Sequence, residues 1–522
     1  MLQIVATRII KSESDMQDGG DTPMPGTAAA ATSGGRGLPP LRFGTKIAYS
    51  SGALLDGIAN QAVNIFIFFY VTAVCGVPGA LAGVALAAGL VVDAVVDPLI
   101  GSLSDGWQSR IGRRLPFMIV GAPFTALFMV LIFSLPAALS GIMLFAWLTF
   151  LSIGLRVSIS LFLLPFNAVG AELSDDYAER SSIAAWRWGF AMLGALIAIV
   201  MGFGIFLGGE GGLSRRAGYA PFALSAALVG MVGAVVAVRA LLTMRDRQHP
   251  PVTNHGAMHV RLWRELGEVF RNQSFRTLFV GALLLFTSLS IHATLGLHAN
   301  TYFWRMTPGQ MQAVTLSLFG GLLLGAPLAG PFLKFMEKRT VLLIGMTGLA
   351  LAFSIPATLR LLGLFPFTGT TMVTILSATV VVGGALMAAA AIAFASMMAD
   401  AADEHEHLFG ARREGLYFAG WAFASKAAAG FGSLVSGIAL QAIGFKSGGD
   451  AAAAAAKLSP ATIDWIGAIY GPGASLLALA AASTCLFYRL DAKKHARILT
   501  ELDQRRAVAS AATVAAAAPL AA

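Results

Sequence analysis

The sequence predicts an all-helical integral membrane protein with twelve membrane-spanning helices in two halves of six. Three observations predict this fold class. The 522-residue chain is 57% hydrophobic and only 12% charged, whereas a soluble domain carries about twice that charged fraction. Its mean hydropathy is +0.74. Apolar runs of ~20 residues, the length that crosses a bilayer as a helix, recur about twelve times along the chain.

The expected spans follow one another at short intervals. They lie at residues 46–74, 79–104, 115–137, 142–170, 183–208, 219–241, 277–303, 310–333, 340–363, 371–399, 414–443 and 462–488. A polar central loop at 242–276 divides them into an amino-terminal half, 44–241, and a carboxyl-terminal half, 277–490. Residues 1–43 are rich in Gly, Ala, Ser and Pro and are expected to form a disordered tail. Residues 491–522 are expected to form a second tail.

A weak internal repeat supports the division into halves. A basic turn with Arg110, Arg113 and Arg114 follows the second span, and a basic turn with Lys338 and Arg339 follows the eighth. Matching turns after the second helix of each half are expected of two parallel six-helix repeats.

The distribution of Lys and Arg predicts the orientation. They gather in both tails, in the central loop and in alternate connections, while most intervening connections are poor in charge. The positive-inside rule therefore places both termini in the cytoplasm. These loops explain the net charge of +9, so the charge does not indicate a nucleic-acid partner. The sequence has no G-x-x-x-x-G-K-[ST] motif, so we expect an ion gradient rather than ATP as the energy source.

Two carboxylates lie inside the second apolar run. Asp93 and Asp97 are four residues apart, so they share one face of a helix. A charge at mid-membrane costs ~2.5–3.5 kcal/mol on insertion scales, and such residues are functional by default. In low dielectric, two facing carboxylates take up a metal cation, share a proton or pair with a base. The pair is a candidate cation site; the alternative is two acids held by structural partners.

Lys426 lies deep in the eleventh run and needs a counter-charge, for which Asp56, Asp93 and Asp97 are the candidates. Its pairing would change with a bound cation; the alternative is a permanent structural ion pair. Asp56 in the first run, with Asn60 and Asn64 on neighbouring turns, is expected to line a cavity and to accept hydrogen bonds from hydroxyl groups. The alternative is a packed polar cluster.

Two arginines in the spans allow two interpretations each. Arg187 stands between two tryptophans early in the fifth run, and its planar donor fork suits a hydroxyl or a carboxylate. The alternative is an arginine that reaches the membrane interface beside a tryptophan belt. Arg156 in the fourth run has the same two interpretations. His292 and His298 in the seventh run are expected to be packing residues.

The stretch at residues 400–407 is dense in acids and histidines and raises the question of a metal site. The favoured interpretation is a charged cytoplasmic turn between the tenth and eleventh spans, paired with Arg412 and Arg413. That interpretation needs no metal ion.

Three patterns in the chain are similar to those of one known family. The first consists of Asp93, Asp97, Pro98, Gly101, Asp105, Gly112, Arg113, Arg114 and Pro116. The second consists of Asp400, Asp403, Glu406, Gly410, Arg412, Arg413, Glu414 and Gly415. The third consists of Leu164, Pro165, Phe166, Glu172, Arg180 and Arg187. Together they resemble the glycoside–pentoside–hexuronide:cation symporters of the major facilitator superfamily, over most of residues 44–490.

The resemblance implies a major facilitator fold and a secondary active transporter, not an enzyme. It implies alternating-access symport of a sugar, glycoside or related derivative with H⁺ or Na⁺, with no other cofactor, in a bacterial inner membrane. The implied cation-coupling residues are Asp93, Asp97, Ser160 and Lys426. The implied substrate-binding positions are Asp56, Asn60, Asn167, Arg187, Trp421 and Lys426. The implied cytoplasmic gating residues are Asp105, Arg113, Arg114, Asp400, Asp403, Glu406, Arg412 and Arg413.

Several positions depart from the family pattern. Val96 stands where Na⁺-coupled members carry an Asn ligand, which favours H⁺, because a shared proton does not need the missing oxygen. Leu163 replaces a sugar-binding Asp, Asn167 a sugar-stacking Trp, and Trp421 a polar residue, so we expect a pocket less polar than a galactoside site. This keeps a second cargo open, an amphipathic lipid such as a lysophospholipid. A non-transporting membrane sensor is the remaining alternative, and the acid pair with Lys426 argues against it.

Overall fold

The computed structural model describes residues 39–209, 212–247, 267–445 and 458–517. Most of the expected amino-terminal tail, the middle of the central loop and residues 518–522 lie outside the described residues. The chain divides into two units, Met1–Pro40 and Leu41–Ala522, and all the helices below belong to the second. No strand occurs in the part of the chain that is described.

The described residues contain twelve membrane-spanning helices. Eleven are long and apolar enough to cross a membrane. The remaining one is the first span, which is built from consecutive helical pieces: α2 (Phe43–Ser50), α3 (Ala53–Ala62) and the π-helical η1 (Val63–Ile67) and η2 (Tyr70–Val74). Ser51 and Gly52, between α2 and α3, keep right-handed helical backbone angles. The protein is therefore an integral membrane protein of the all-helical class, as the sequence predicts.

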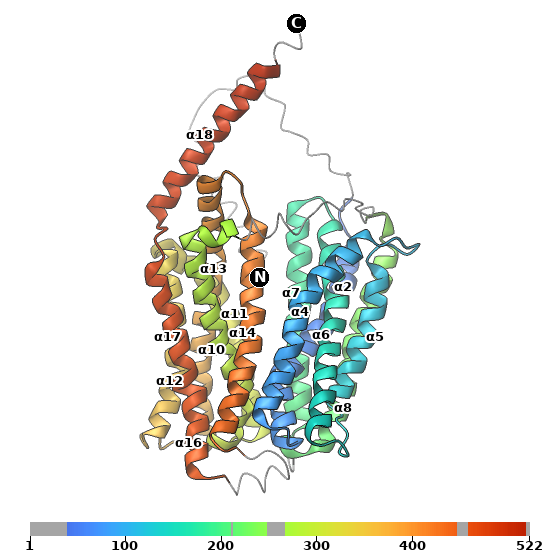
Figure 1. Cartoon of the computed structure of the whole chain (residues 1–522), viewed down its shortest axis with the longest axis vertical. Helices are drawn as coiled ribbons and strands as arrows, with labels where there is room; N and C mark the ends of the chain where they lie inside the picture. Colours follow the sequence, from blue (N-terminus) through green and yellow to red (C-terminus); the bar gives the residue numbers. More distant parts are fainter. Residues whose placement is uncertain (1–38, 210–211, 248–266, 446–457, 518–522) are drawn as a thin grey trace. The chain divides into compact units, whose positions relative to one another are not determined.

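The elements follow one another as the hydropathy pattern predicts (Figure 1). The amino-terminal half continues with α4 (Gly79–Gly106), α5 (Leu115–Ile132), α6 (Gly141–Glu172), α7 (Tyr177–Ile199), η3 (Val200–Phe206), η4 (Gly212–Ser214), η5 (Arg216–Gly218), α8 (Tyr219–Leu242) and η6 (Arg245–Arg247). The carboxyl-terminal half comprises α10 (Gln273–His298), η7 (Ala299–Phe303), α11 (Pro308–Phe335), α12 (Lys338–Leu361), α13 (Gly369–Phe409), α14 (Glu414–Ala442), α16 (Pro460–Ala468), η8 (Ile469–Gly473), α17 (Ala474–Thr484) and η9 (Cys485–Phe487). The chain ends in α18 (Ala492–Ala517).

One expected boundary is wrong. The tenth span, predicted to end at residue 399, continues as α13 to Phe409, so the acidic stretch at 400–407 is helix and not a turn. The helix stops at Gly410, whose φ of 78° suits glycine because it has no Cβ. Elsewhere polar caps fix the ends: Asp176 accepts a hydrogen bond from the Glu179 backbone nitrogen, and Thr307 forms a capping box with Gln310.

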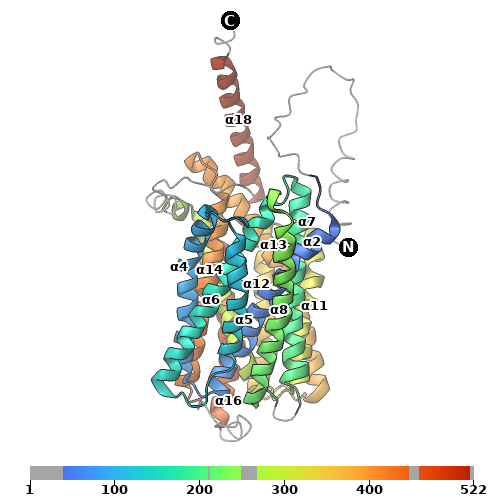
Figure 2. The ribbon, with the colours of Figure 1, turned by 90° about the vertical axis from the view of Figure 1, so that its right-hand side faces the viewer.

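The two halves meet along α4 and α14, which pack against each other (Figure 2). Glycines allow the backbones to touch at one end of this seam. A Cβ on Gly437 would lie 2.2 Å from the Gly79 carbonyl oxygen, and a Cβ on Gly83 would lie 2.8 Å from the Ser433 carbonyl oxygen. Small residues at a helix crossing permit this close approach.

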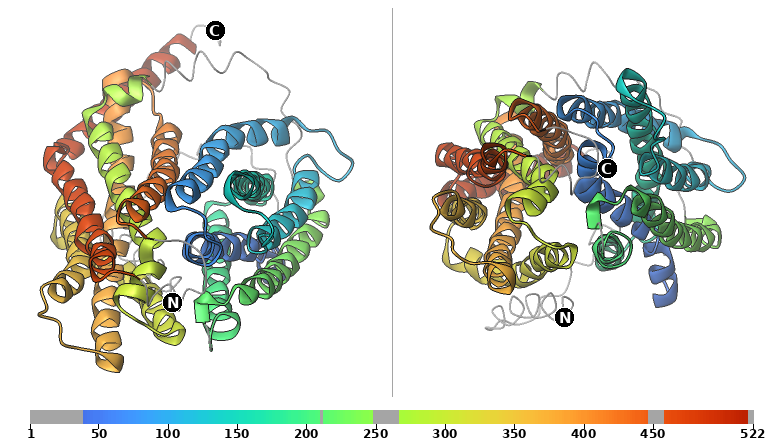
Figure 3. Two further views of the ribbon diagram at one scale, coloured as in Figure 1. Left: turned by 60° about the horizontal axis from the view of Figure 1, so that its bottom comes forward. Right: turned by 90° about the horizontal axis from the view of Figure 1, so that it is seen from below.

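Three clusters of buried apolar side chains show which end of the bundle is closed. One cluster combines residues of both halves, such as Phe66 and Tyr70 with Tyr302 and Phe445, and lies at the ends of the spans opposite to α2 and α18 (Figure 1). At the other end each half has a cluster of its own. Figure 3 shows the helices gathered in two groups when viewed along their axes. Among the described residues, the halves therefore share an apolar core only at the end away from α2 and α18.

Candidate functional site

The acid pair on α4 faces α14 and contacts its lysine. Lys426 Nζ lies 2.9 Å from Asp93 Oδ2 and forms a second, shorter salt bridge with Asp97 Oδ2. Ser160 on α6 donates a hydrogen bond of 2.6 Å to Asp93 Oδ1. The structure thus brings together the four residues expected to couple the cation, from three helices and from both halves.

This cluster has unused capacity for a positive charge. Two carboxylates face one ammonium, and Asp93 is only 4% exposed. Asp97 Oδ1 is buried without a hydrogen-bond partner among the described residues, and a buried acceptor left unpaired costs ~1–3 kcal/mol. Pro98, the next residue, has no N–H to donate to the preceding helix turn. A proton or a small cation would satisfy the free oxygen.

A central cavity of about 450 Å³ lies between the halves, next to this cluster. Its wall includes Leu90 of α4, which precedes Asp93 by one turn, and Ser425 and Ala429 of α14, which flank Lys426. Most of the wall is apolar. The polar lining residues are Gln61, Asn64, Ser152, Arg156, Ser290, His292, Thr294, Asn300, Thr315, Ser425, Ser433 and Tyr470. A pocket of this size fits a small solute or part of an amphipathic one.

The expected substrate-binding residues Asp56, Asn60, Asn167, Arg187, Trp421 and Lys426 are not among the described residues that line this cavity, and their roles stay predictions. Asn60 donates a hydrogen bond of 2.5 Å to Asp56 Oδ1. Trp421 packs against Phe394, with ring centroids 5.4 Å apart.

Arg187 is also engaged locally. It donates a hydrogen bond of 3.2 Å to the Asn167 backbone oxygen and lies 5.9 Å from the centroid of the Phe166 ring. The structure therefore places Arg187 beside Asn167, and their roles with a bound substrate stay predictions.

Of the residues that the sequence reasoning had considered outside the expected site, Arg156, Asn64 and His292 line the cavity. The Arg156 guanidinium lies within electrostatic reach of Asp93 and Asp56. Asn300 and Ser290, which the sequence reasoning did not single out, also line the cavity. The signal that could have found them is a polar side chain inside an otherwise apolar run.

The expected gating residues of the amino-terminal half form one charged cluster at the ends of α4, α5 and α6. Arg114 Nη1 donates to Glu172 at 2.6 Å, and Arg114 Nε donates to Asp105 at 3.1 Å. Arg113 also pairs with Glu172. Both arginines are about 6% exposed, so they are held between helices rather than free in solvent.

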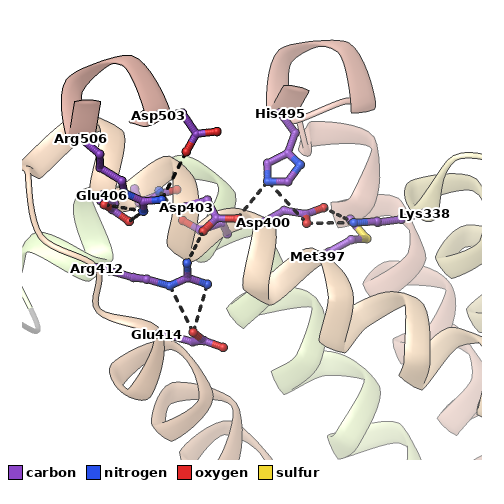
Figure 4. Close-up of polar contacts among 12 residues, drawn as sticks. Lys338, Met397, Asp400, Asp403, Glu406, Arg412, Glu414, His495, Asp503 and Arg506 are labelled. Carbon is purple, nitrogen blue, oxygen red and sulfur yellow. Dashed lines mark hydrogen bonds and ion pairs between the residues drawn. The ribbon is translucent and has the colours of Figure 1, made fainter. Parts of the chain in front are cut away.

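The expected gating residues of the carboxyl-terminal half form a second charged cluster at the end of α13 (Figure 4). Lys338 binds Asp400 at 2.6 Å, and Arg412 binds Asp403 at 3.1 Å. The pairing with Arg412 agrees with the sequence expectation. Arg413 is the cap residue of α14.

The remaining bases of this cluster come from α18, which no sequence signal had connected to it. Lys494 binds Glu404 at 2.6 Å, His495 lies 3.1 Å from Asp403 Oδ2, and Arg506 binds Glu406 at 2.9 Å. The hydrogen bond from Arg506 to Glu406 raises the pKa of the Arg506 guanidinium. The acids of residues 400–407 are therefore neutralised largely by basic side chains.

Twelve membrane-spanning helices in two halves, with a cavity between them and a charged cluster beside it, define a membrane transport protein of the major facilitator type. The chain matches the family described as "MFS/sugar transport protein" over residues 48–492, and it belongs to that family. It is accordingly a transporter and not an enzyme, and a multi-pass protein of the cell membrane.

The chain is similar to curated transporters. It is 34% identical over 166 residues to the "Uncharacterized symporter sll1374" of Synechocystis sp., a match that spans 31% of this chain and 30% of that relative. It is 25% identical over 476 residues to the "Isoprimeverose transporter" of Lactiplantibacillus pentosus. That match spans 88% of this chain and 91% of the relative.

Solved structures share the fold. The "Crystal structure of D-xylose-proton symporter" superposes with a TM-score of 0.58, at 14% sequence identity, over 87% of this chain and 99% of that chain. At this identity the likeness shows the fold alone.

Proposed function

We propose that the chain is a cation-coupled symporter of a sugar or sugar derivative that works by alternating access. The observation that carries the proposal is the cluster of Asp93, Asp97, Ser160 and Lys426 beside the central cavity. The name of the isoprimeverose relative supports a sugar-like cargo. The driving force would be an ion gradient, and the partner a small molecule rather than a nucleic acid or an ATPase.

The cluster supports a coupling role because the Lys426 ammonium lies where a cation would bind, against both carboxylates. Asp93 and Asp97 both lie on α4 of the amino-terminal half. The ammonium of Lys426, on α14 of the carboxyl-terminal half, pairs with both of them. A coupling cation that neutralises the acid pair would weaken this bridge. Since the bridge joins α4 to α14, binding of the cation would alter how the halves pack, and substrate in the adjoining cavity would act on the same interface.

We propose H⁺ as the coupling ion rather than Na⁺. Val96 contributes no side-chain oxygen, and Lys426 occupies part of the space between the carboxylates. A proton needs one carboxylate oxygen, and Asp97 Oδ1 is free, whereas Na⁺ is bound by several oxygens at once. Protonation of Asp97 would remove its charge and release Lys426 from one of its two partners.

We also propose that both termini face the cytoplasm, as the distribution of Lys and Arg predicts. The shared apolar core would then close the outer side of the membrane, and the structure would represent an inward-facing state. Amphipathic lipids are the second candidate cargo, favoured by the mainly apolar wall of the cavity.

The test is substrate-induced ion movement in proteoliposomes. Glycosides, uronic acids and lysolipids are added to the purified chain while internal pH and Na⁺ are both followed. Proton entry supports the proposal, and sodium entry refutes the choice of H⁺. Asp97→Asn should abolish gradient-driven uptake, while Asp464→Asn, which removes an exposed carboxylate on α16, should leave it intact. Full accumulation by Asp97→Asn would refute the coupling role of the pair.

A further inference from the structure

Arg156 is a charged side chain at the wall of the cavity whose donors are not used. It lies on α6, one turn before Ser160, and it is partly buried. Among the described residues it forms no hydrogen bond and no salt bridge; its recorded interactions are the longer-range ones with Asp93 and Asp56. A guanidinium has five N–H donors in a planar fork. All five are available to a molecule in the cavity.

A purely structural role does not account for this arginine. Arginines near helix ends extend their charge to the membrane interface. Arg156 instead lies near the middle of α6 (Gly141–Glu172), and its neighbours in the cavity wall come from both halves. Two carboxylates at longer range, Asp93 and Asp56, stabilise its charge but do not engage its donors.

Six charged residues lie deeper in the spans than Arg239, Arg360 and Asp464, which are near helix ends. The charges of these six balance before any ion or substrate binds. The acids are Asp56, Asp93 and Asp97, and the bases are Arg156, Arg187 and Lys426. A coupling cation adds one positive charge to this neutral set, and an uncompensated charge inside a membrane protein is expensive. A substrate with one negative charge would restore the balance.

We propose that the transported substrate carries one negatively charged group, a carboxylate or a phosphate, and that Arg156 binds it at the wall of the cavity. This inference rests on the transport function proposed above and names the substrate class: a monoanion whose uncharged part fills the mainly apolar remainder of the cavity. Arginine binds both anions through two parallel hydrogen bonds. A uronic acid or its glycoside would supply the carboxylate, and a lysophosphatidic acid would supply the phosphate.

The position of Arg156 also links the anion to the cation. Arg156 and Ser160 are four residues apart and share one face of α6, and Ser160 is hydrogen-bonded to Asp93. The residues that would hold the anionic group and the acid pair are therefore about one helix turn, ~5.4 Å, apart along α6. Opposite charges at this separation attract, so each ligand raises the affinity for the other.

The test uses pairs of ligands that differ only in the charge. One pair is p-nitrophenyl β-D-glucuronide and p-nitrophenyl β-D-glucoside, with the galacto- and manno-isomers alongside. The other pair is 1-oleoyl lysophosphatidic acid and 1-oleoylglycerol. We expect the intact chain to bind the charged member of one pair at least about tenfold more tightly than its neutral partner, and the pair concerned identifies the source of the anion.

Substitutions then assign the effect to Arg156. Arg156→Gln should weaken binding of the charged ligand by about 10- to 100-fold, which is the loss of affinity expected when hydrogen bonds to a charged group are removed. Binding of the neutral ligand should not change. Arg156→Lys keeps the positive charge but loses the planar set of donors, so its affinity for the charged ligand should lie between those of the unmodified chain and Arg156→Gln. Arg239→Gln, which removes an exposed arginine from α8, is the matched control and should bind as the unmodified chain does. Unchanged anion binding in Arg156→Gln would overturn the proposal.

Electrical recordings separate this inference from the transport function. Symport of one cation with a monoanion moves no net charge, whereas symport of one cation with a neutral sugar moves one positive charge. We expect substrate-induced proton entry without a current. A current with a neutral sugar would overturn the inference and leave cation-coupled transport standing. The absence of uptake and ion movement with every compound would overturn the transport function as well.

Discussion

Thr72 Oγ1 and His298 Nε2 lie 2.9 Å apart and join the first span of one half to the first span of the other. The Thr72 hydroxyl donates to the Phe68 backbone oxygen at 2.6 Å, so it accepts the hydrogen bond from the imidazole, whose proton is assigned to Nε2. His298 is fully buried against Phe69 and Phe445. This hydrogen bond ties the halves together at their closed end.

Replacement of Thr72 by Val should loosen the closed end. It keeps the shape but removes the acceptor, which leaves a buried imidazole N–H unpaired at a cost of ~1–3 kcal/mol. Cys75, a partly buried cysteine at the end of the first span, is a natural reporter. We expect faster labelling of Cys75 by a membrane-impermeant maleimide, with Thr243→Val, an exposed site beyond α8, as the control. Slower or unchanged labelling would contradict the role of the hydrogen bond.

Gly437→Ala should prevent the halves from closing. The added Cβ would overlap the Gly79 carbonyl oxygen at 2.2 Å, and overpacking of this kind costs ~1–3 kcal/mol or more. We expect uptake to fall at least about tenfold and Cys75 labelling to rise. Gly415→Ala lies on the same helix, where a Cβ meets nothing within 4 Å, and should transport normally. Equal uptake by the two variants would show that the seam does not close tightly.

Lys426→Ala should destabilise the protein, and Asp97→Asn should partly reverse that loss. Removal of one partner from a buried charge cluster costs ~3–5 kcal/mol, but the lysine side chain is 34% exposed, so we expect about 1–3 kcal/mol. Neutralising Asp97 in the Lys426→Ala background lowers the remaining repulsion between the carboxylates. Thermal unfolding of the four species in a double-mutant cycle measures the coupling. Strictly additive changes would argue against the bridge.

The contacts of α18 should contribute unequally to stability. Glu404, the partner of Lys494, is only 8% exposed, so Lys494→Gln leaves a buried acid with less compensation and should lower the melting temperature measurably. Arg506 is exposed and pairs with Glu406, and exposed ion pairs contribute little to stability because water screens them. Arg506→Gln should therefore unfold at nearly the temperature of the unmodified chain. The reverse order of the two variants would disprove this ranking.

The spans were predictable because a bilayer-crossing helix has a length and a composition that hydropathy detects. The tenth span was cut short for a physical reason. Its last turns carry Asp400, Asp403 and Glu404, which read as a polar loop, yet they stay helical because Lys338, Arg412 and bases of α18 pair with them. The pairs with α18 join residues 90 and 92 positions apart in the chain and leave no local pattern.

The cation cluster was predictable to a larger extent than the cavity wall. The four-residue spacing of Asp93 and Asp97 indicates a shared helix face, and a deep Lys426 requires an acid. The rotation of each span about its axis is less constrained, because a span that is apolar all round has no hydrophobic stripe to fix the rotation. For this reason the sequence did not show that Arg156 lines the cavity while Arg187 donates to the Asn167 backbone.

The carboxyl-terminal segment is more ordered than the sequence analysis expected. Residues 491–522 were expected to form a tail, but α18 continues to Ala517, in keeping with the high helix propensity of alanine. The docking of the helix depends on Ile498 and Leu502, which are buried in the apolar cluster of the carboxyl-terminal half.

The apolar cluster shared by the two halves gives the opening of that end a thermal signature. Opening would bring side chains such as Phe66, Phe69 and Tyr302, now buried, into contact with water, and hydration of apolar surface increases the heat capacity. Hydration of polar surface lowers the heat capacity, so the charged residues at the opposite end would change it in the other direction when they become exposed. The equilibrium between the two states of the carrier should therefore vary with temperature along a curve rather than a straight line in a van't Hoff plot.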